Sequence, residues 1–364
     1  TGVQTCALPI CNEIENGTIL KGTITSDVTL AAGNTYKLSG EYIVEEGATL
    51  HIEEGVKIIA VYDDIADYIL VKQGGKINAV GTPDKPIVMT SEKEEPGAWG
   101  GIHICGRAHT NAEGGKGSSE IGGAVYGGND DADNSGTLQY IRLEYTGFAF
   151  DEEHEANGIS FYGVGNGTIV DHCQAYKGSD DGFEFFGGSV NVSNLVAVSC
   201  SDDSFDWTEG WNGKGTNLVA YQEDKSTLGY DCDCLMECDN NGSNNAATPV
   251  AHPVLKNLIL VGNGGSKQGI RLRAGTEVEI DNAKVCGKGQ PLTVETALTE
   301  NALKNGTSKL TNITLTSELS SKEGIYTHAD FIAVTSNKVD ANLSYSSFED
   351  IRKECSWMNG SWVK

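Results

Sequence analysis

Two short acidic segments contain the residues of this sequence that are best suited to chemistry. Residues 179–184 read SDDGFE and residues 201–206 read SDDSFD, so the second segment repeats the first 22 positions later. The repeated carboxylates are those of Asp180, Asp181, Glu184, Asp202, Asp203 and Asp206. Carboxylates stacked on neighbouring strands, about 4.8 Å apart, repel one another unless a cation neutralises them. Since calcium prefers oxygen ligands, the sequence predicts a calcium site formed by these six residues.

The same two segments also fit a structural interpretation. Aspartate and serine are common at chain corners because their side chains form hydrogen bonds with the nearby backbone. Bound calcium and structural corners therefore both remain open at this point, and a catalytic role is a third alternative.

Aromatic residues recur beside the acidic ones. The side chains in question are those of Tyr162, Phe186, Trp207 and Trp211. Exposed aromatic rings offer flat surfaces on which sugar rings can pack, so we expect these four residues to form a ligand-binding face. The opposing interpretation is that alternate residues of a strand point inward, which would place many aromatic side chains in the core.

The spacing of the aromatic segments predicts the architecture. Residues 158–163, 182–187 and 204–210 read GISFYG, GFEFFG and SFDWTEG, and they start 24 and then 22 positions apart. Apolar and polar residues alternate in the strand-like segments of the chain, which is typical of strands with one buried face. A repeat of roughly 22 to 25 residues, built from strands alone, is what one three-sided coil of a β-helix requires. The sequence therefore predicts an all-β protein formed by a single right-handed parallel β-helix.

On this interpretation the chain has four parts. Residues 1–10 resemble the translation of a sequencing adapter, so we expect the native start and any targeting segment to be missing. Residues 11–39 are expected to cap the N-terminal end, residues 40–320 to form the β-helix, and residues 321–364 to cap the other end. Within the last part, apolar residues between 348 and 355 have helical spacing, which predicts a short amphipathic helix covering that end.

Charge and hydropathy limit the possible partners. The 364 residues include 51 acidic and 26 basic ones, which gives a formal net charge of −25. Such a surface repels nucleic acids and anionic lipid headgroups, so we exclude both as partners. No apolar stretch reaches the roughly 18 residues of a membrane span, so we expect a protein that does not span a membrane.

The cysteines do not predict a defined framework. Eight remain when the two near the N-terminus are left out. Cys173 and Cys200 are 27 positions apart, close to one coil, so they could form a disulfide or pack as small apolar residues on successive coils. Cys232, Cys234 and Cys238 lack the spacing of a zinc site, which makes local packing or a local disulfide the better interpretation.

Several segments are similar to a known group of proteins. Residues 47–59, 82–106, 122–147 and 157–188 resemble a family of right-handed parallel β-helix proteins from Bacteroidetes, with a pectate-lyase-like fold and no established role. Proteins of this family are usually outer-surface lipoproteins or secreted proteins. The resemblance therefore implies an extracellular or outer-membrane-surface location, with a lipoprotein anchor in the missing N-terminal part.

Two classes of function follow. We expect a non-catalytic protein that binds an extracellular polysaccharide or glycoconjugate, or that mediates adhesion, with calcium as the candidate cofactor. The alternative is a polysaccharide-cleaving enzyme, because polygalacturonase-like β-helices use paired aspartates and a basic residue further along the chain. In that case Asp180, Asp181, Asp202 and Asp203 resemble the catalytic aspartates, and Arg271 resembles the basic residue or serves as the base of a calcium-dependent lyase. The Gly-His-Gly motif of those hydrolases is missing.

Overall fold

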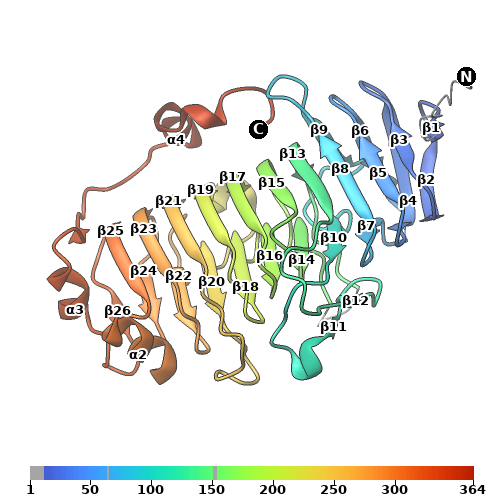
Figure 1. The fold of residues 1–364 in the computed structure, drawn as a ribbon. Helices are drawn as coiled ribbons and strands as arrows, with labels where there is room; N and C mark the ends of the chain where they lie inside the picture. Colours follow the sequence, from blue (N-terminus) through green and yellow to red (C-terminus); the bar gives the residue numbers. More distant parts are fainter. Residues whose placement is uncertain (1–11, 64, 151–153) are drawn as a thin grey trace, which may run out of the picture.

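The computed structural model describes residues 12–63, 65–150 and 154–364, which wind into one long parallel β-helix (Figure 1). Residues 1–10, which resemble an adapter, lie outside the described residues. Strands of successive coils pair in parallel and in register, as in the pairing of Phe183 with Phe205. The predicted all-β fold with a single parallel β-helix is confirmed.

Each coil contributes to three faces, which we call A, B and C. Face A begins with β1 (Asn12–Ile14), β3 (Val28–Leu30), β5 (Thr49–Ile52) and β8 (Lys76–Val80). Face B begins with the first halves of β2 (Ile19–Ile24) and β4 (Thr35–Val44), followed by β6 (Lys57–Ala60) and β9 (Ile87–Ser91), and it ends at β27 (Lys338–Val339). Later coils use long strands that bend from face A to face B: β13 (Gly136–Glu144), β15 (Ile169–Tyr176), β17 (Asn191–Val198), β19 (Lys214–Tyr221), β21 (Val254–Val261), β23 (Glu279–Cys286) and β25 (Lys309–Leu315).

Face C carries the acidic segments. It begins with the second halves of β2 and β4 and continues through β7 (Tyr68–Val71), β10 (Ile102–Cys105), β14 (Ile159–Tyr162), β16 (Phe183–Phe186), β18 (Phe205–Thr208), β20 (Met236–Asp239), β22 (Gln268–Arg273), β24 (Gln290–Val294) and β26 (Ser320–Ser321). Outside the three faces lie β11 (Gly117–Ser118), β12 (Val125–Tyr126), α1 (Lys225–Leu228), α2 (Ala297–Asn305), α3 (His328–Ala333), α4 (Phe348–Glu354) and the 3-10 turns η1 (Glu113–Gly115) and η2 (Ser356–Met358).

The core follows the alternation of the strands. On face C the aromatic rings that point inward stack from coil to coil, with ring centroids 5.0 Å apart for Phe161 and Phe185. The eight cysteines of the described residues are all free and buried. Cys173 and Cys200 therefore pack as small apolar residues, and the disulfide considered for them is not formed.

Each long strand bends at a residue with positive φ. From β17 onward this residue is an asparagine, at positions 194, 217, 257, 282 and 312, with φ between 56° and 65°. Asparagine enters this left-handed region more readily than most residues. The amides also form a chain of hydrogen bonds, in which Asn217 donates to Asn194 at 2.8 Å and Asn257 donates to Asn217 at 3.0 Å.

Coil length is regular only where no loop is inserted. Equivalent residues of β14 and β16 are 24 positions apart and those of β16 and β18 are 22 apart, as predicted. From β18 to β20 the distance rises to 31, and from β20 to β22 it rises to 34, because loops leave the solenoid after β19 and after β20. The sequence repeat is therefore visible in the centre and hidden further along.

The expected N-terminal cap is part of the solenoid instead. Within residues 12–39, β1 pairs in parallel with β3, and β2 pairs in parallel with β4, so these strands belong to the first two coils of the β-helix. The physical reason is that Leu20, Leu30 and Leu38 already have the inward positions of a coil and are buried.

The predicted C-terminal helix forms as α4, but it does not cover the end of the solenoid. Residues 340–364, which we call the strap, run back along the outside of face B toward the N-terminal coils (Figure 1). Ile351, Met358 and Trp362 are buried against that face, and the backbone N–H of Ser361 donates to the carbonyl of Pro83. The far end is instead closed by α2, α3 and the adjoining loops, whose Leu303, Tyr326 and Phe331 belong to the main core.

A long excursion between β10 and β13 covers part of face C. Residues 106–135, which we call the wall, include the small β11–β12 hairpin. The Tyr126 hydroxyl donates to the Glu209 carboxylate at 2.8 Å, and the Thr110 hydroxyl donates to the same carboxylate at 2.6 Å, which holds the wall against the coil of β18. Among the described residues, no helix is both long and apolar enough to cross a membrane.

Candidate cation-binding groove

An acidic groove of about 410 Å³ lies on face C beside the wall. Its lining combines ten carboxylates with the guanidinium of Arg271. The carboxylates are those of Glu120, Glu155, Asp180, Asp181, Glu184, Asp202, Asp203, Asp206, Asp233 and Glu237. The structure thus brings together all six predicted calcium ligands, together with Arg271.

The outward residues of successive strands form one side of the groove. Glu184, Asp206 and Glu237 occupy equivalent positions on β16, β18 and β20, and Arg271 follows them on β22. Each lies between two inward apolar residues, as Glu184 does between Phe183 and Phe185. The alternation that fills the core therefore forces these charged residues outward onto one line.

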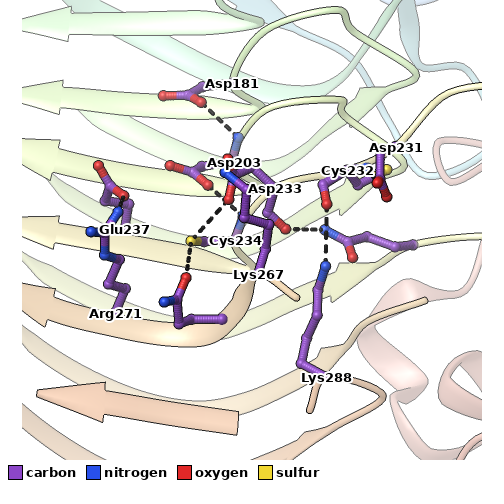
Figure 2. Close-up of polar contacts among 12 residues, drawn as sticks. Asp181, Asp203, Asp231, Cys232, Asp233, Cys234, Glu237, Lys267, Arg271 and Lys288 are labelled. Carbon is purple, nitrogen blue, oxygen red and sulfur yellow. Dashed lines mark hydrogen bonds and ion pairs between the residues drawn. The ribbon is translucent and has the colours of Figure 1, made fainter. Parts of the chain in front are cut away.

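The corner before each strand forms the second side. Asp181 accepts a hydrogen bond of 2.8 Å from the backbone N–H of Asp203, and Asp203 accepts one of 2.7 Å from the backbone N–H of Cys234 (Figure 2). Both side chains are buried, with exposed fractions of 6% and 4%. The structural-corner interpretation thus applies to Asp181 and Asp203, each of which still directs its carboxylate at the groove.

Basic residues neutralise only the C-terminal end of the groove. Arg271 pairs with Glu237 at 3.0 Å, and Lys267 pairs with Asp233 (Figure 2). Arg271 also pairs with Glu295 at 3.2 Å. Arg273 adds a second ion pair to Glu237. Among the described residues, none of the six predicted calcium ligands forms an ion pair with a lysine, arginine or histidine.

Burial and mutual repulsion raise the pKa of these carboxyl groups. The pKa of Asp180 rises to about 8 through burial and the charges of Asp202 and Glu155. Burial, followed by the charge of Asp233, raises the pKa of Asp202 to about 6. The pKa values of four more carboxyl groups lie well above their usual range for the same two causes: Asp181, Glu184, Asp203 and Asp206. In the absence of a cation the groove therefore holds protons near neutral pH.

The donor set fits a hard divalent cation. Ligand oxygens on opposite sides of one calcium ion are separated by up to about 5 Å, because each bond is about 2.3 to 2.6 Å long. Two sets of three carboxylates have oxygens within 4.8 Å of one another and, in the part of the chain that the structure describes, no basic partner. They are Asp180, Asp181 and Asp202, and, one step along the groove, Asp181, Glu184 and Asp206. Asp181 belongs to both sets.

The predicted aromatic ligand-binding face is not formed. Tyr162 and Phe186 do point outward from face C, but the wall covers them, and their rings stack with centroids 4.4 Å apart. Trp207 and Trp211 point into the core and are 1% exposed. The residues that the structure places around the groove include no aromatic side chain.

Four carboxylates of the groove are not among the six predicted calcium ligands. Glu237 has the same strand position as Asp206, but the loop after β19 shifts it out of the 22-residue repeat. Asp233 lies at the end of that loop. Glu120 and Glu155 come from the wall and from the segment before β14, so only tertiary packing brings them to the groove. Glu237 could have been identified from the alternation of polar and apolar residues, because it lies between Met236 and Cys238 as Asp206 lies between two inward aromatic residues.

The chain was compared with known protein families, curated proteins and solved structures. The sequence profile of a family described as pectate-lyase-like beta helix domain matches residues 22–363, which is nearly the whole described chain. No curated protein and no solved structure gives a significant match.

Proposed function

The chain belongs to the family of pectate-lyase-like β-helix domains, and from this premise we propose that it is a non-catalytic carbohydrate-binding protein whose acidic groove holds calcium. The fold family supports a role with carbohydrates. Because polysaccharides are encountered outside the cell, we also propose that the protein acts in the extracellular space or at the cell surface. The observation that carries the proposal is that the described residues lining the groove include ten carboxylates and one guanidinium, that of Arg271.

Calcium is the cofactor that best accounts for this charge. Buried carboxylates without partners are costly, and calcium is bound through six to eight oxygen ligands. Asp180, Asp181, Glu184, Asp202 and Asp206 would hold it, since their oxygens are close enough together and no described lysine, arginine or histidine forms an ion pair with them. When bound, the ion supplies positive charge at the floor of the groove, which can attract an anionic ligand.

The glycan would then bind through the ion. Among the described residues that line the groove there is no aromatic ring on which a neutral sugar could pack, and the charge of the groove repels an acidic sugar. A calcium ion shared between the aspartates and a uronate carboxylate removes that repulsion. We therefore propose polysaccharides that contain uronate as the ligand class.

The surroundings of Arg271 favour binding over cleavage by a lyase. A lyase base must give up its proton to accept one from the sugar, and the contacts with Glu295 and Glu237 raise the pKa of Arg271. A guanidinium held between two carboxylates therefore stays protonated. Its visible role is to neutralise Glu237 and Glu295.

A hydrolase is the second candidate, and one observation favours it. The pKa values of Asp180 and Asp202, about 8 and about 6, differ in the way that a general acid and a general base require. With oxygens within 4.8 Å of each other, one carboxyl group of such a pair would protonate the leaving oxygen and the other would act as the nucleophile on the sugar.

One experiment separates the three possibilities. The protein is incubated with polygalacturonate, alginate and a neutral glucan, with calcium or with a chelator, and both retention and product release are measured. The proposal predicts calcium-dependent retention on the uronate polymers without release of unsaturated or reducing ends. New reducing ends that require Asp180 and Asp202 would support the hydrolase instead. Release of unsaturated uronates would indicate a lyase, and equal retention with the chelator would refute the role of calcium.

A further inference from the structure

A second pocket lies on the opposite side of the coil from the acidic groove. It has a volume of about 400 Å³ and is formed where the strap crosses the bend between faces A and B. The strands β19, β21 and β23 supply its floor, and the end of α4 with the segment just after it supplies its outer side. Pockets of this size accommodate small organic ligands.

Asparagine amides line the floor of this pocket. The side chains of Asn217, Asn257 and Asn282 belong to the hydrogen-bonded chain at the bends, in which Asn282 donates to Asn257 at 2.9 Å. The chain of amides stops there, because Asn312 donates to Asp281 and not to Asn282. The Asn282 side-chain oxygen consequently accepts no hydrogen bond from the described residues, and the second hydrogen of each amide is also available.

An indole ring forms the outer side. Trp357 lies next to Ser356 in the strap, and its ring is partly buried against Trp362, with centroids 6.2 Å apart. Trp362 is fully buried, so it fixes the strap and leaves Trp357 at the pocket. The strap is further tied down by an ion pair between Lys284 and Glu354, two residues that also line the pocket.

From this combination we propose that the pocket is a binding site for a neutral sugar ring. The C–H groups of a pyranose carry slight positive charge and pack against the negative face of an indole. Its hydroxyl groups both donate and accept hydrogen bonds, as do the amides across the pocket. Lys284 and Glu354 neutralise each other, so the pocket has no excess charge and does not select an ionic ligand. The proposal goes beyond the acidic groove and does not depend on calcium.

The test uses the whole protein in the presence of a chelator. Neutral oligosaccharides built from glucose, xylose, mannose and galactose are titrated, and binding is followed by saturation-transfer NMR and tryptophan fluorescence. We expect at least one neutral series to bind, with affinity about tenfold lower in Trp357→Ala. We also expect weaker binding in Asn282→Gly, which removes the amide and keeps the positive φ without strain. Asp206→Asn, in the acidic groove, should leave this binding unchanged.

Two results would overturn the proposal. One is the absence of saturation transfer from every neutral series at millimolar concentration. The other is binding that is unchanged in Asn282→Gly and in Trp357→Ala. Trp357→Ala could also lower the melting temperature because the strap detaches. In that case the sugar affinity of Asn282→Gly alone tests the proposal, since Asn282 is exposed and lies outside the strap.

Discussion

The Asp181 carboxylate accepts a hydrogen bond of 2.8 Å from the backbone N–H of Asp203, one coil further along the solenoid. Asp203 repeats the contact with the N–H of Cys234 at 2.7 Å. These two aspartates therefore stabilise the corner of each coil while they face the groove. Asp202 and Asp206 face the same groove and accept no such bond from the backbone of the described residues, so stability and cation binding can be separated by substitution.

The first prediction concerns this separation. Asp203→Ala should lower stability by about 2 kcal/mol, because it leaves the buried N–H of Cys234 without an acceptor. Asp203→Asn keeps an oxygen acceptor and should change stability by less than half as much in the presence of a chelator. Thermal melting of both variants checks this. If Asp203→Ala and Asp203→Asn lose the same amount of stability, the hydrogen bond to Cys234 is not the contribution of Asp203.

The second prediction concerns pH. Burial raises the pKa of Asp180 to about 8, above its value in the unfolded chain, so the folded state binds more protons. Without calcium, the stabilisation from this group is present at low pH and is lost as the pH rises from about 4 through about 8. Asp180→Asn should reduce that loss, and added calcium should reverse it in the native protein.

Melting temperatures from about pH 5 to about pH 9, with a chelator and with calcium, measure this effect. Asp84→Asn is the matched control, because Asp84 is exposed and lies outside the groove. Two results would contradict the prediction. One is a melting temperature of the native protein that does not depend on pH in the presence of the chelator. The other is an Asp180→Asn variant whose melting temperature depends on pH as that of the control does.

The third prediction concerns the C-terminal end. The Glu300 carboxylate on α2 is buried and accepts hydrogen bonds from the backbone N–H groups of Glu323, Ile325 and Tyr326, which lowers its pKa. Glu300→Gln should cost about 2 kcal/mol near neutral pH, because an amide N–H₂ then faces backbone donors.

The sign of its pH dependence follows from the lowered pKa. The stabilisation by Glu300 is present above the unfolded-state pKa of about 4.3 and is lost as the pH falls through the folded-state value. The difference in unfolding free energy between the native protein and Glu300→Gln should therefore become smaller as the pH falls into the acid range. Exposed Glu318→Gln serves as the control, and a Glu300→Gln variant as stable as that control at neutral pH would refute the interpretation.

The fourth prediction concerns the amides at the bends. Asn257 has φ +60° and both donates to Asn217 and accepts from Asn282. Asn257→Ala should cost about 2 kcal/mol, from left-handed strain and lost hydrogen bonds. Asn257→Gly removes the same bonds without the strain, so its melting temperature should fall by clearly less. Identical melting temperatures for the two variants would show that strain has no part in the effect.

The sequence predicted the parts of the fold and the site that depend on regular local spacing. Glu184 and Asp206 were found because no loop interrupts the 22 residues between them, and the alternation of strands then put them on one line. Glu237 was missed because an inserted loop changes that spacing. Glu120 was out of reach because it arrives with the wall, through contacts between residues distant in the chain.

The errors have equally physical causes. Trp207 and Trp211 were expected outside, yet large aromatic rings gain most from burial, and the interior of the coil has room for them. The helix at α4 was predicted correctly from its apolar spacing, but spacing alone does not indicate which surface those residues cover. Here the surface is the side of the solenoid, where Val219 and Ile259 would otherwise be exposed.

The most direct test of the central claim is a calorimetric titration of the chelator-treated protein with calcium. We expect saturable binding that releases protons and becomes tighter as the pH rises. We also expect Asp206→Asn to bind about tenfold more weakly, while Asp84→Asn binds like the native protein. If the native protein takes up no calcium, or if Asp206→Asn and Asp84→Asn bind it equally well, the acidic groove is not a calcium site and the proposed function is wrong.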